Sequence, residues 1–197
     1  MQAARNWYAL KPQMEEMDMD TLPHERMKYT RRIYTGKVLN LRRDTAQFPS
    51  GKETVREVVE HKGAVAIAAV DDDRNIYLVQ QYRYAFDDEF LELPAGKLDS
   101  EQEIPLDAAH RELREETGLR ADSMEYLGYI CPSVAICTEK IHIFLARGLH
   151  MGECDPDEDE FLNVITMPLD ELYALAGRGG LRDAKTLCAL TLLLGKL

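Results

Sequence analysis

The sequence lacks the features that mark secreted, zinc-binding or membrane proteins. Its 197 residues include four cysteines, which form no C-x-x-C pair, and no histidine spacing completes a zinc set. No apolar run approaches the roughly 20 residues that a membrane-spanning helix needs. Residues 1–20 are acidic and contain no signal-peptide core. These absences predict a cytoplasmic protein with reduced thiols and without a membrane partner.

Positive charge is also in short supply. Lys and Arg number 24 against 35 Asp and Glu, which gives a formal net charge of −11 at pH 7. Non-specific binding of nucleic acid relies on a surplus of Lys and Arg against the phosphate backbone, so no nucleic-acid partner is expected. A small anionic substrate is compatible with this charge if the site supplies its own metal ion and arginines. Apolar and charged contents of 45% and 30% are those of an ordinary globular domain.

The most informative stretch runs from Gly96 to Leu119. Pro105 suits the first position of a helix, where its missing N–H would have had no partner. Gly118 suits the left-handed residue just past the helix end. A helix between them places residues three and four apart on common stripes. The apolar stripe holds Leu106, Ala109 and Leu113, and the neighbouring acidic stripe holds Glu112, Glu115 and Glu116.

Two interpretations of this acidic stripe compete. Charge clusters on helices are commonly solvated surface. However, carboxylates at this spacing repel one another, and the helix dipole disfavours anions near its C-terminal end. A bound cation would remove both costs. All-oxygen ligands suit a hard ion such as Mg²⁺ or Mn²⁺, which is often shared with a phosphate.

The same stretch resembles the Nudix box, G-x5-E-x7-R-E-U-x-E-E-x-G-U, where U is a bulky aliphatic residue. The match is complete from Glu103 to Leu119. Six residues instead of five separate Gly96 from Glu103, which lengthens a loop and leaves the helix register unchanged. The resemblance favours the metal site over the solvated face.

From about Arg32 to its end, the chain is similar to the ADP-ribose pyrophosphatase branch of the Nudix hydrolases. The segments that carry this similarity are residues 56–65, 80–84, 91–98, 138–141, 157–161 and 182–186. The branch usually carries Ser-Pro-Gly in the loop after the box, where this chain has Ser133, Val134 and Ala135. That difference does not affect the predicted metal ligands, but it leaves open which nucleoside diphosphate sugar is the substrate.

The resemblance implies an α/β fold, an α/β/α sandwich around a mixed sheet with a small N-terminal antiparallel β element. We expect a loosely ordered leader at residues 1–26, a β meander at 27–61 and the Nudix hydrolase domain at 62–197. In the meander we expect strands at 33–41, 44–48 and 53–60. Such a meander is too small to bury a core alone, and the family forms homodimers in which these strands reach the partner's site. A homodimer is therefore expected.

The implied reaction is metal-dependent hydrolysis of the pyrophosphate of a nucleoside diphosphate sugar. ADP-ribose, giving AMP and ribose 5-phosphate, is the expected substrate. The alternatives are another sugar nucleotide such as a GDP-sugar and, in a different class, a non-catalytic Nudix-like binding module. Such a module should show a broken glutamate set, and this set is intact.

Each expected site residue carries a role. Glu112, Glu116 and Glu115, with the Ala95 carbonyl, are the expected ligands of Mg²⁺ or Mn²⁺, and Arg111 is expected to orient the glutamates. Recognition of the phosphates, sugar or base is expected from Arg56, Arg83, Glu92 and Tyr34. Each of these has an alternative interpretation. Arg56 and Arg83 could be exposed strand arginines without a partner, Glu92 a structural carboxylate and Tyr34 a packed side chain.

The general base is expected outside the box, because a carboxylate bound to a dication has its pKa driven down. The acidic loop that ends at residues 157–160 offers candidates. Alternation in an extended segment puts Glu158 and Glu160 on one side, so we assign Glu158 as the base and Glu160 as a supporting metal ligand. A solvated acidic loop, with Glu139 as a further candidate base, is the alternative.

Overall fold

The computed structural model describes residues 24–152 and 162–196, so most of the predicted leader lies outside the described residues. The chain divides into two compact units, Met1–Glu60 and His61–Leu197. Each unit is described by itself below. Within the described residues, no helix is both long and apolar enough to cross a membrane.

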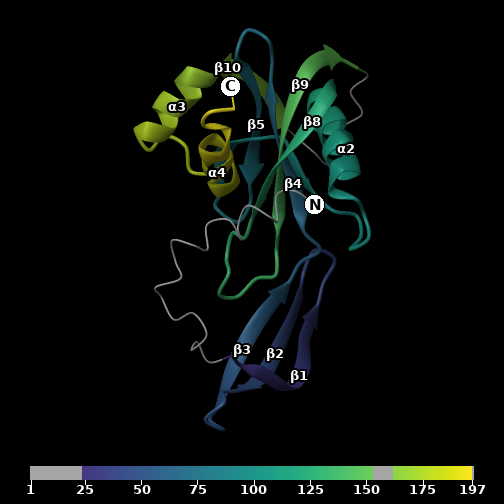
Figure 1. Cartoon of the computed structure of the whole chain (residues 1–197), viewed down its shortest axis with the longest axis vertical. Coiled ribbons are helices and arrows are strands. Elements are labelled where there is room, and N and C mark those ends of the chain that lie inside the picture. Colours follow the sequence, from purple (N-terminus) through teal and green to yellow (C-terminus); the bar gives the residue numbers. More distant parts are fainter. Residues whose placement is uncertain (1–23, 153–161, 197) are drawn as a thin grey trace, which may run out of the picture. The chain divides into compact units, whose positions relative to one another are not determined.

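The first unit is a three-stranded antiparallel sheet of β1 (Arg26–Thr35), β2 (Asn40–Gln47) and β3 (Glu53–Glu60) (Figure 1). The prediction of one strand over 33–41 was wrong. The chain turns back within that segment, where the Gly36 N–H donates to the Leu39 carbonyl at 3.0 Å. Tyr34 pairs with Leu41 across the hairpin. The apolar residues of 33–41 therefore belong to the end of β1 and the start of β2. A pattern of alternating residues looks the same in one strand and in two strands joined by a tight turn.

The second unit is built on a seven-stranded sheet with the main order β10-β5-β4-β9-β8, in which β6 pairs with β5 and β7 with β4. The pair β4–β9 is parallel and every other recorded pair of this sheet is antiparallel, so the sheet is mixed. The strands are β4 (Ala64–Val70), β5 (Asn75–Arg83), β6 (Asp88–Glu92), β7 (Ala95–Lys97), β8 (Leu119–Ile130), β9 (Ile141–Met151) and β10 (Leu162–Pro168).

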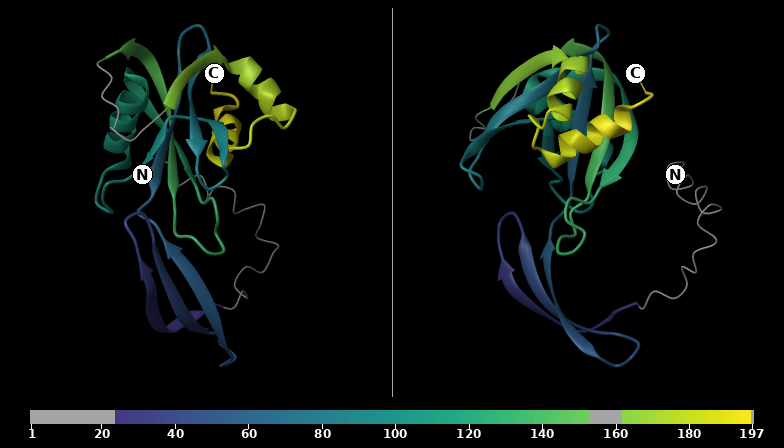
Figure 2. Two further views of the ribbon diagram at one scale, coloured as in Figure 1. Left: turned by 180° about the vertical axis from the view of Figure 1, so that it is seen from behind. Right: turned by 90° about the vertical axis from the view of Figure 1, so that its left-hand side faces the viewer.

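Strand β4 is buried along its whole length and separates two hydrophobic clusters. Side chains alternate across a strand, so Ala66 and Ala68 join one cluster while Val65 and Ile67 join the other. The first cluster includes residues of α3 (Leu169–Gly177) and α4 (Ala184–Leu193), and the second includes residues of α2 (Pro105–Thr117). The helices cover the two faces of the sheet (Figures 1 and 2). The predicted α/β/α sandwich is confirmed.

Helix α2 begins and ends as its local residues predict. Pro105 occupies the first turn, and Gly118 adopts φ 70° at the C-terminal cap, where its N–H donates to the Arg114 carbonyl. The predicted apolar stripe needs one correction, because Leu106 is 41% exposed while Ala108 is fully buried. Leu106 lies in the first turn, at the margin of the buried face. The residues of α2 that pack against the sheet are Ala108, Ala109 and Leu113, all fully buried.

Candidate active site

A cleft of about 450 Å³ in the second unit brings the box together with the start of α4. Its walls come from β4, β5, β7, α2, α4 and the loop after β8. The lining residues that matter for the chemistry are His61, Arg83, Ala95, Gly96, Arg111, Glu112, Glu115, Glu116, Glu139, Asp183 and Lys185. Five of the residues assigned from the box region, Ala95 and the box side chains at 111, 112, 115 and 116, therefore meet at one place.

The acidic stripe of α2 is not a solvated surface. Glu112 and Glu116 are 7% and 3% exposed, and Glu115 is partly buried. Burial of a carboxylate is costly unless it is paired or hydrogen-bonded. Ordinary helix surfaces do not bury two glutamates one turn apart, so the first of the two interpretations is excluded.

The backbone of β7 lies directly against these glutamates. Glu116 Oε2 accepts a hydrogen bond from the Ala95 N–H at 2.8 Å. A Cβ atom added at Gly96 would lie 2.0 Å from the Glu112 carboxyl carbon, so any side chain here would displace that carboxylate. The glycine of the box thus has a steric role, because it admits the glutamate to the cleft.

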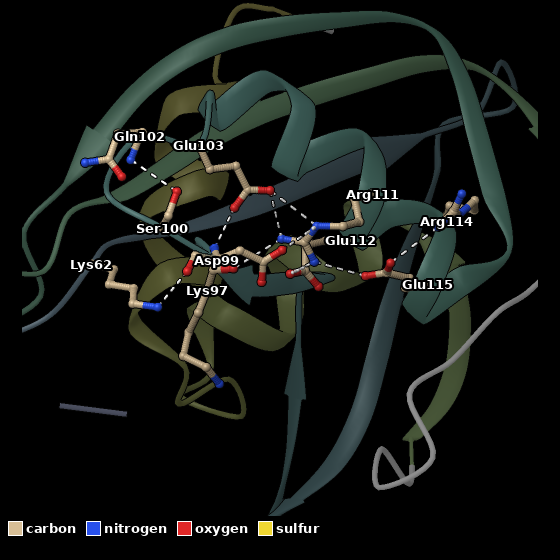
Figure 3. Close-up of polar contacts among 10 residues, drawn as sticks. All are labelled: Lys62, Lys97, Asp99, Ser100, Gln102, Glu103, Arg111, Glu112, Arg114 and Glu115. Carbon is tan, nitrogen blue, oxygen red and sulfur yellow. Dashed lines mark hydrogen bonds and ion pairs between the residues drawn. The ribbon is translucent and has the colours of Figure 1, made fainter. Parts of the chain in front are cut away.

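Arg111 contacts three carboxylates of the box, those of Glu103, Glu112 and Glu115 (Figure 3). Its Nη1 donates to Glu112 Oε1 at 2.7 Å and to Glu115 Oε2 at 3.0 Å. Its Nη2 and Nε donate to Glu103 Oε1 at 3.2 and 3.3 Å. Burial acts to lower the pKa of Arg111, but the charge of Glu112 and the hydrogen bonds to Glu112 and Glu115 hold that pKa above its usual range. Arg111 therefore orients the glutamates and stays charged.

The donor set fits a hard divalent cation in its chemistry. Glu112, Glu115 and Glu116 offer carboxylate oxygens to the same cleft that Ala95 lines. Within 24–152 and 162–196, no three His, Cys, Asp or Glu side chains already stand in the arrangement of a metal site. Arg111 donates to one oxygen of Glu112 and to one oxygen of Glu115, so it orients both carboxylates where they line the cleft.

Another part of the cleft wall lies over a buried ion-pair network around Glu92. Arg83 donates to both carboxylate oxygens of Glu92, at 2.6 and 2.7 Å, and Lys185 also pairs with Glu92. Burial acts to raise the pKa of Glu92, but the hydrogen bonds from Arg83 and the charge of Lys185 hold it below its usual value of 4.5. Glu92 is 2% exposed, so it lies beneath the wall and Arg83 forms the surface.

The four remaining predicted residues belong to other parts of the chain. Tyr34 in β1 is 56% exposed, and Arg56 in β3 is paired with Glu25, so Arg56 is not an unpartnered strand arginine. Both belong to the first unit. The assigned base Glu158 and supporting ligand Glu160 lie outside the described residues, and their roles stay predictions.

The sequence did not reveal three polar residues of the cleft. His61 Nδ1 accepts a hydrogen bond from the Gly63 N–H and lies 3.5 Å from Glu139 Oε1. Lys185 and Asp183 lie 3.2 Å apart at the start of α4. In the sequence these residues stand out only because the segments 56–65 and 182–186 resemble the family.

Comparison with known proteins places this geometry in context. The model of the Nudix domain family matches residues 60–190. An ADP-ribose pyrophosphatase of Bacillus subtilis (strain 168) is 38% identical over 160 residues, which cover 80% of this chain and 86% of that protein. A methanol dehydrogenase activator of Bacillus methanolicus is 37% identical over 173 residues, which cover 87% of this chain and 93% of that protein.

Two further similarities concern substrate class and fold. A GDP-mannose pyrophosphatase of Cronobacter sakazakii (strain ATCC BAA-894) is 31% identical over 151 residues, which cover 68% of this chain and 78% of that protein. Among solved structures, the crystal structure of an ADP compounds hydrolase superposes with a TM-score of 0.78 at 24% identity. That superposition covers 89% of this chain and 97% of the other, and it speaks to the fold alone.

Proposed function

The chain belongs to the Nudix hydrolase family, and from that premise we propose that it hydrolyses the pyrophosphate of a nucleoside diphosphate sugar. ADP-ribose is the proposed preferred substrate, with AMP and ribose 5-phosphate as products. The observation that carries the proposal is the meeting of three box glutamates with the Arg83–Glu92 pair around one cleft. An acidic wall and a wall with a fixed guanidinium suit a metal-neutralised diphosphate.

The acidic wall is the part of the site that would hold Mg²⁺ or Mn²⁺. Glu112, Glu116 and Glu115, with the Ala95 carbonyl, are the proposed ligands. A divalent cation bound there supplies charge neutralisation on the non-bridging phosphate oxygens. Arg111 orients the side chains of Glu112 and Glu115 through hydrogen bonds, and Gly96 leaves the space that the Glu112 carboxylate occupies.

The hydrolysis breaks one P–O bond of the bridging oxygen and forms one P–O bond to the oxygen of water. The bridging oxygen leaves with one phosphate, and the water proton passes to a general base. We propose Glu158 as that base, with Glu160 as a supporting ligand, because alternation in an extended segment puts both on one side. Arg83 binds a phosphate oxygen through its fork, and Arg56 and Tyr34 are proposed contacts to the remainder of the substrate.

The choice of sugar nucleotide rests on the relatives. The Bacillus subtilis relative is an ADP-ribose pyrophosphatase, whereas the Cronobacter sakazakii relative is a GDP-mannose pyrophosphatase with a lower identity. Val134 is 83% exposed in the loop after the box, where the branch usually has proline. A GDP-sugar is therefore the second candidate substrate.

A substrate panel with product identification tests the proposal. ADP-ribose, a GDP-sugar and a nucleoside triphosphate are compared at equal Mg²⁺ by kcat/KM, and the products are identified by chromatography. We expect ADP-ribose to lead and to give AMP. A tenfold preference for a GDP-sugar, which corresponds to about 1.4 kcal/mol of transition-state stabilisation, would select the second candidate. No hydrolysis of any of these compounds would reject the proposal.

Variants of single carboxylates test the assigned roles. Glu116→Gln keeps the size and removes the charge, and we expect kcat to fall by at least about 10²-fold. Excess chelator should abolish activity in the wild-type protein. Glu158→Gln should lower kcat by about 10²–10⁴-fold with substrate still bound. If Glu158→Gln turns over normally while Glu139→Gln is inactive, the base is Glu139.

A further inference from the structure

The network around Glu92 joins two cations through one buried carboxylate. Arg83 Nε donates to Oε1 at 2.6 Å and Arg83 Nη2 to Oε2 at 2.7 Å, while Lys185 Nζ pairs with Oε2 from the other side. A carboxylate buried to this extent is stable only with partners that satisfy its charge and its lone pairs. The orientation of Glu92 is thus set by both cations together.

The Lys185 side chain is also held by a residue at the N-terminus of α4. Its residue is 9% exposed, and its Nζ also lies 3.2 Å from Asp183 Oδ1. Asp183 caps the helix, where its Oδ2 accepts hydrogen bonds from the Thr186 N–H at 3.0 Å and the Thr186 hydroxyl at 2.6 Å. Two carboxylates of fixed position therefore hold the ammonium group, although a lysine side chain has four rotatable bonds.

Arg83 is the most exposed member of this network at the cleft, which Asp183 and Lys185 also line. Its side chain is 41% exposed, against 3% for Glu92 and 10% for Lys185. In the part of the chain that the structure describes, the recorded hydrogen bonds of Arg83 use two of the five N–H groups of a guanidinium, both to Glu92. A planar fork held on one edge presents its other edge in a fixed plane, which is the geometry that oxyanion recognition uses.

We propose that Lys185 is a positioning residue for phosphate recognition: it holds the Glu92 carboxylate from the α4 side and thereby fixes the plane of the Arg83 guanidinium at the cleft wall. The role rests on the proposed function, which supplies the diphosphate as the ligand. Lys185 acts through Glu92 and needs no contact with substrate of its own.

Lys185→Met tests this role, because it keeps most of the side-chain length and removes the charge. In wild type we expect a sharp Nε–Hε NMR signal for Arg83, assigned by its loss in Arg83→Lys. In Lys185→Met this signal should broaden or shift. The affinity for inorganic pyrophosphate with Mg²⁺, measured by calorimetry, should fall by about tenfold, and the loss in hydrolysis should appear chiefly in KM.

A double-mutant cycle separates positioning from direct contact. If Lys185 acts through Glu92, then Lys185→Met should add no further loss of pyrophosphate affinity in a Glu92→Gln background. Additive losses would mean that Lys185 contacts the phosphate directly, and the proposal would be wrong. Lys185→Gln, shorter and uncharged, is the second variant if the methionine variant does not fold, and the same losses are expected of it.

Lys196→Met is the matched control. Lys196 pairs with Glu125 at 2.6 Å, but both side chains are about half exposed. Its loss should change neither the Arg83 signal nor the pyrophosphate affinity. If Lys185→Met folds and leaves the Arg83 signal and the pyrophosphate affinity unchanged, the proposal is wrong, and Lys185 only stabilises the position of α4. If the NMR and pyrophosphate results hold but no sugar nucleotide is hydrolysed, the proposed function fails and the positioning role stands.

Discussion

Gly96 is the residue at which the smallest change should have the largest effect on the chemistry. A methyl group there would lie 2.0 Å from the carboxyl carbon of Glu112, so Gly96→Ala should push that carboxylate out of the cleft. Displacement of a reacting group by about 1 Å can cost about 10²-fold in rate. We expect kcat/KM to fall by at least that factor, as measured by steady-state hydrolysis of ADP-ribose.

Gly177→Ala is the control for this substitution. Gly177 closes α3 and has no atom within 4 Å of the position of an added Cβ, so activity should not change. Full activity in Gly96→Ala would show that Glu112 works from a different position. Circular dichroism of both variants distinguishes a displaced carboxylate from a misfolded chain.

At this scale the sequence predicted the acidic wall and missed much of the opposite one. The glutamates share one helix, so their spacing alone brings them together. Glu92 and Lys185 are separated by 93 residues along the chain, and their contact depends on how α4 packs against the sheet. No local pattern contains that information. The sequence therefore predicts Glu92 as a site residue but does not predict Lys185 as its partner.

The contact between α4 and the segment before β7 depends on one hydroxyl group. Thr186 is fully buried, and its Oγ1 accepts a hydrogen bond from the Leu93 N–H at 2.9 Å and donates to Asp183 at 2.6 Å. Thr186→Val keeps the shape and leaves that N–H without a partner. Such a loss costs about 1–3 kcal/mol, so the free energy of unfolding in urea should fall by that amount.

Thr191→Val provides the comparison within the same helix. The Thr191 hydroxyl is exposed and donates to the Leu187 carbonyl at 3.3 Å, so its loss should change the free energy of unfolding by less than about 0.5 kcal/mol. Equal effects of the two substitutions would mean that the loss comes from valine in a helix and not from the buried contact.

Elements with local end signals were predicted well, and elements defined by pairing were not. Helix α2 begins at Pro105 and ends before Gly118 as predicted, because both signals are properties of single residues. The pattern of 33–41 predicts one strand, whereas the hairpin turn at 36–39 divides it. Strand β8 starts at Leu119, directly after the glycine that ends α2, because its pairing with β9 extends to Met151.

For the whole molecule, we propose that two copies associate through the first unit. The sheet β1-β2-β3 leaves Met27, Tyr29, Ile33 and Val55 between 45% and 64% exposed. Both hydrophobic clusters consist of residues from the second unit. A three-stranded sheet with exposed apolar side chains is not expected to be stable without cover.

Light scattering measures this association. The full chain, with a mass of 22.5 kDa, should have twice that mass at micromolar concentrations. Removal of residues 1–26 should leave the dimer intact. Removal of 1–60 should give a monomer that lacks hydrolysis, since Tyr34 and Arg56 are lost with the dimer. A full-length chain that stays at 22.5 kDa across the concentration range would contradict the proposal.

Arg111 has a consequence for the biogenesis of the enzyme. Its guanidinium already offsets the mutual repulsion of the box carboxylates through its hydrogen bonds to Glu103, Glu112 and Glu115. The chain therefore carries its own counter-ion at these carboxylates. If the protein works with a divalent cation as proposed, we expect scarcity of that cation to stop turnover without unfolding the chain, and turnover to resume when the ion returns, with no new synthesis.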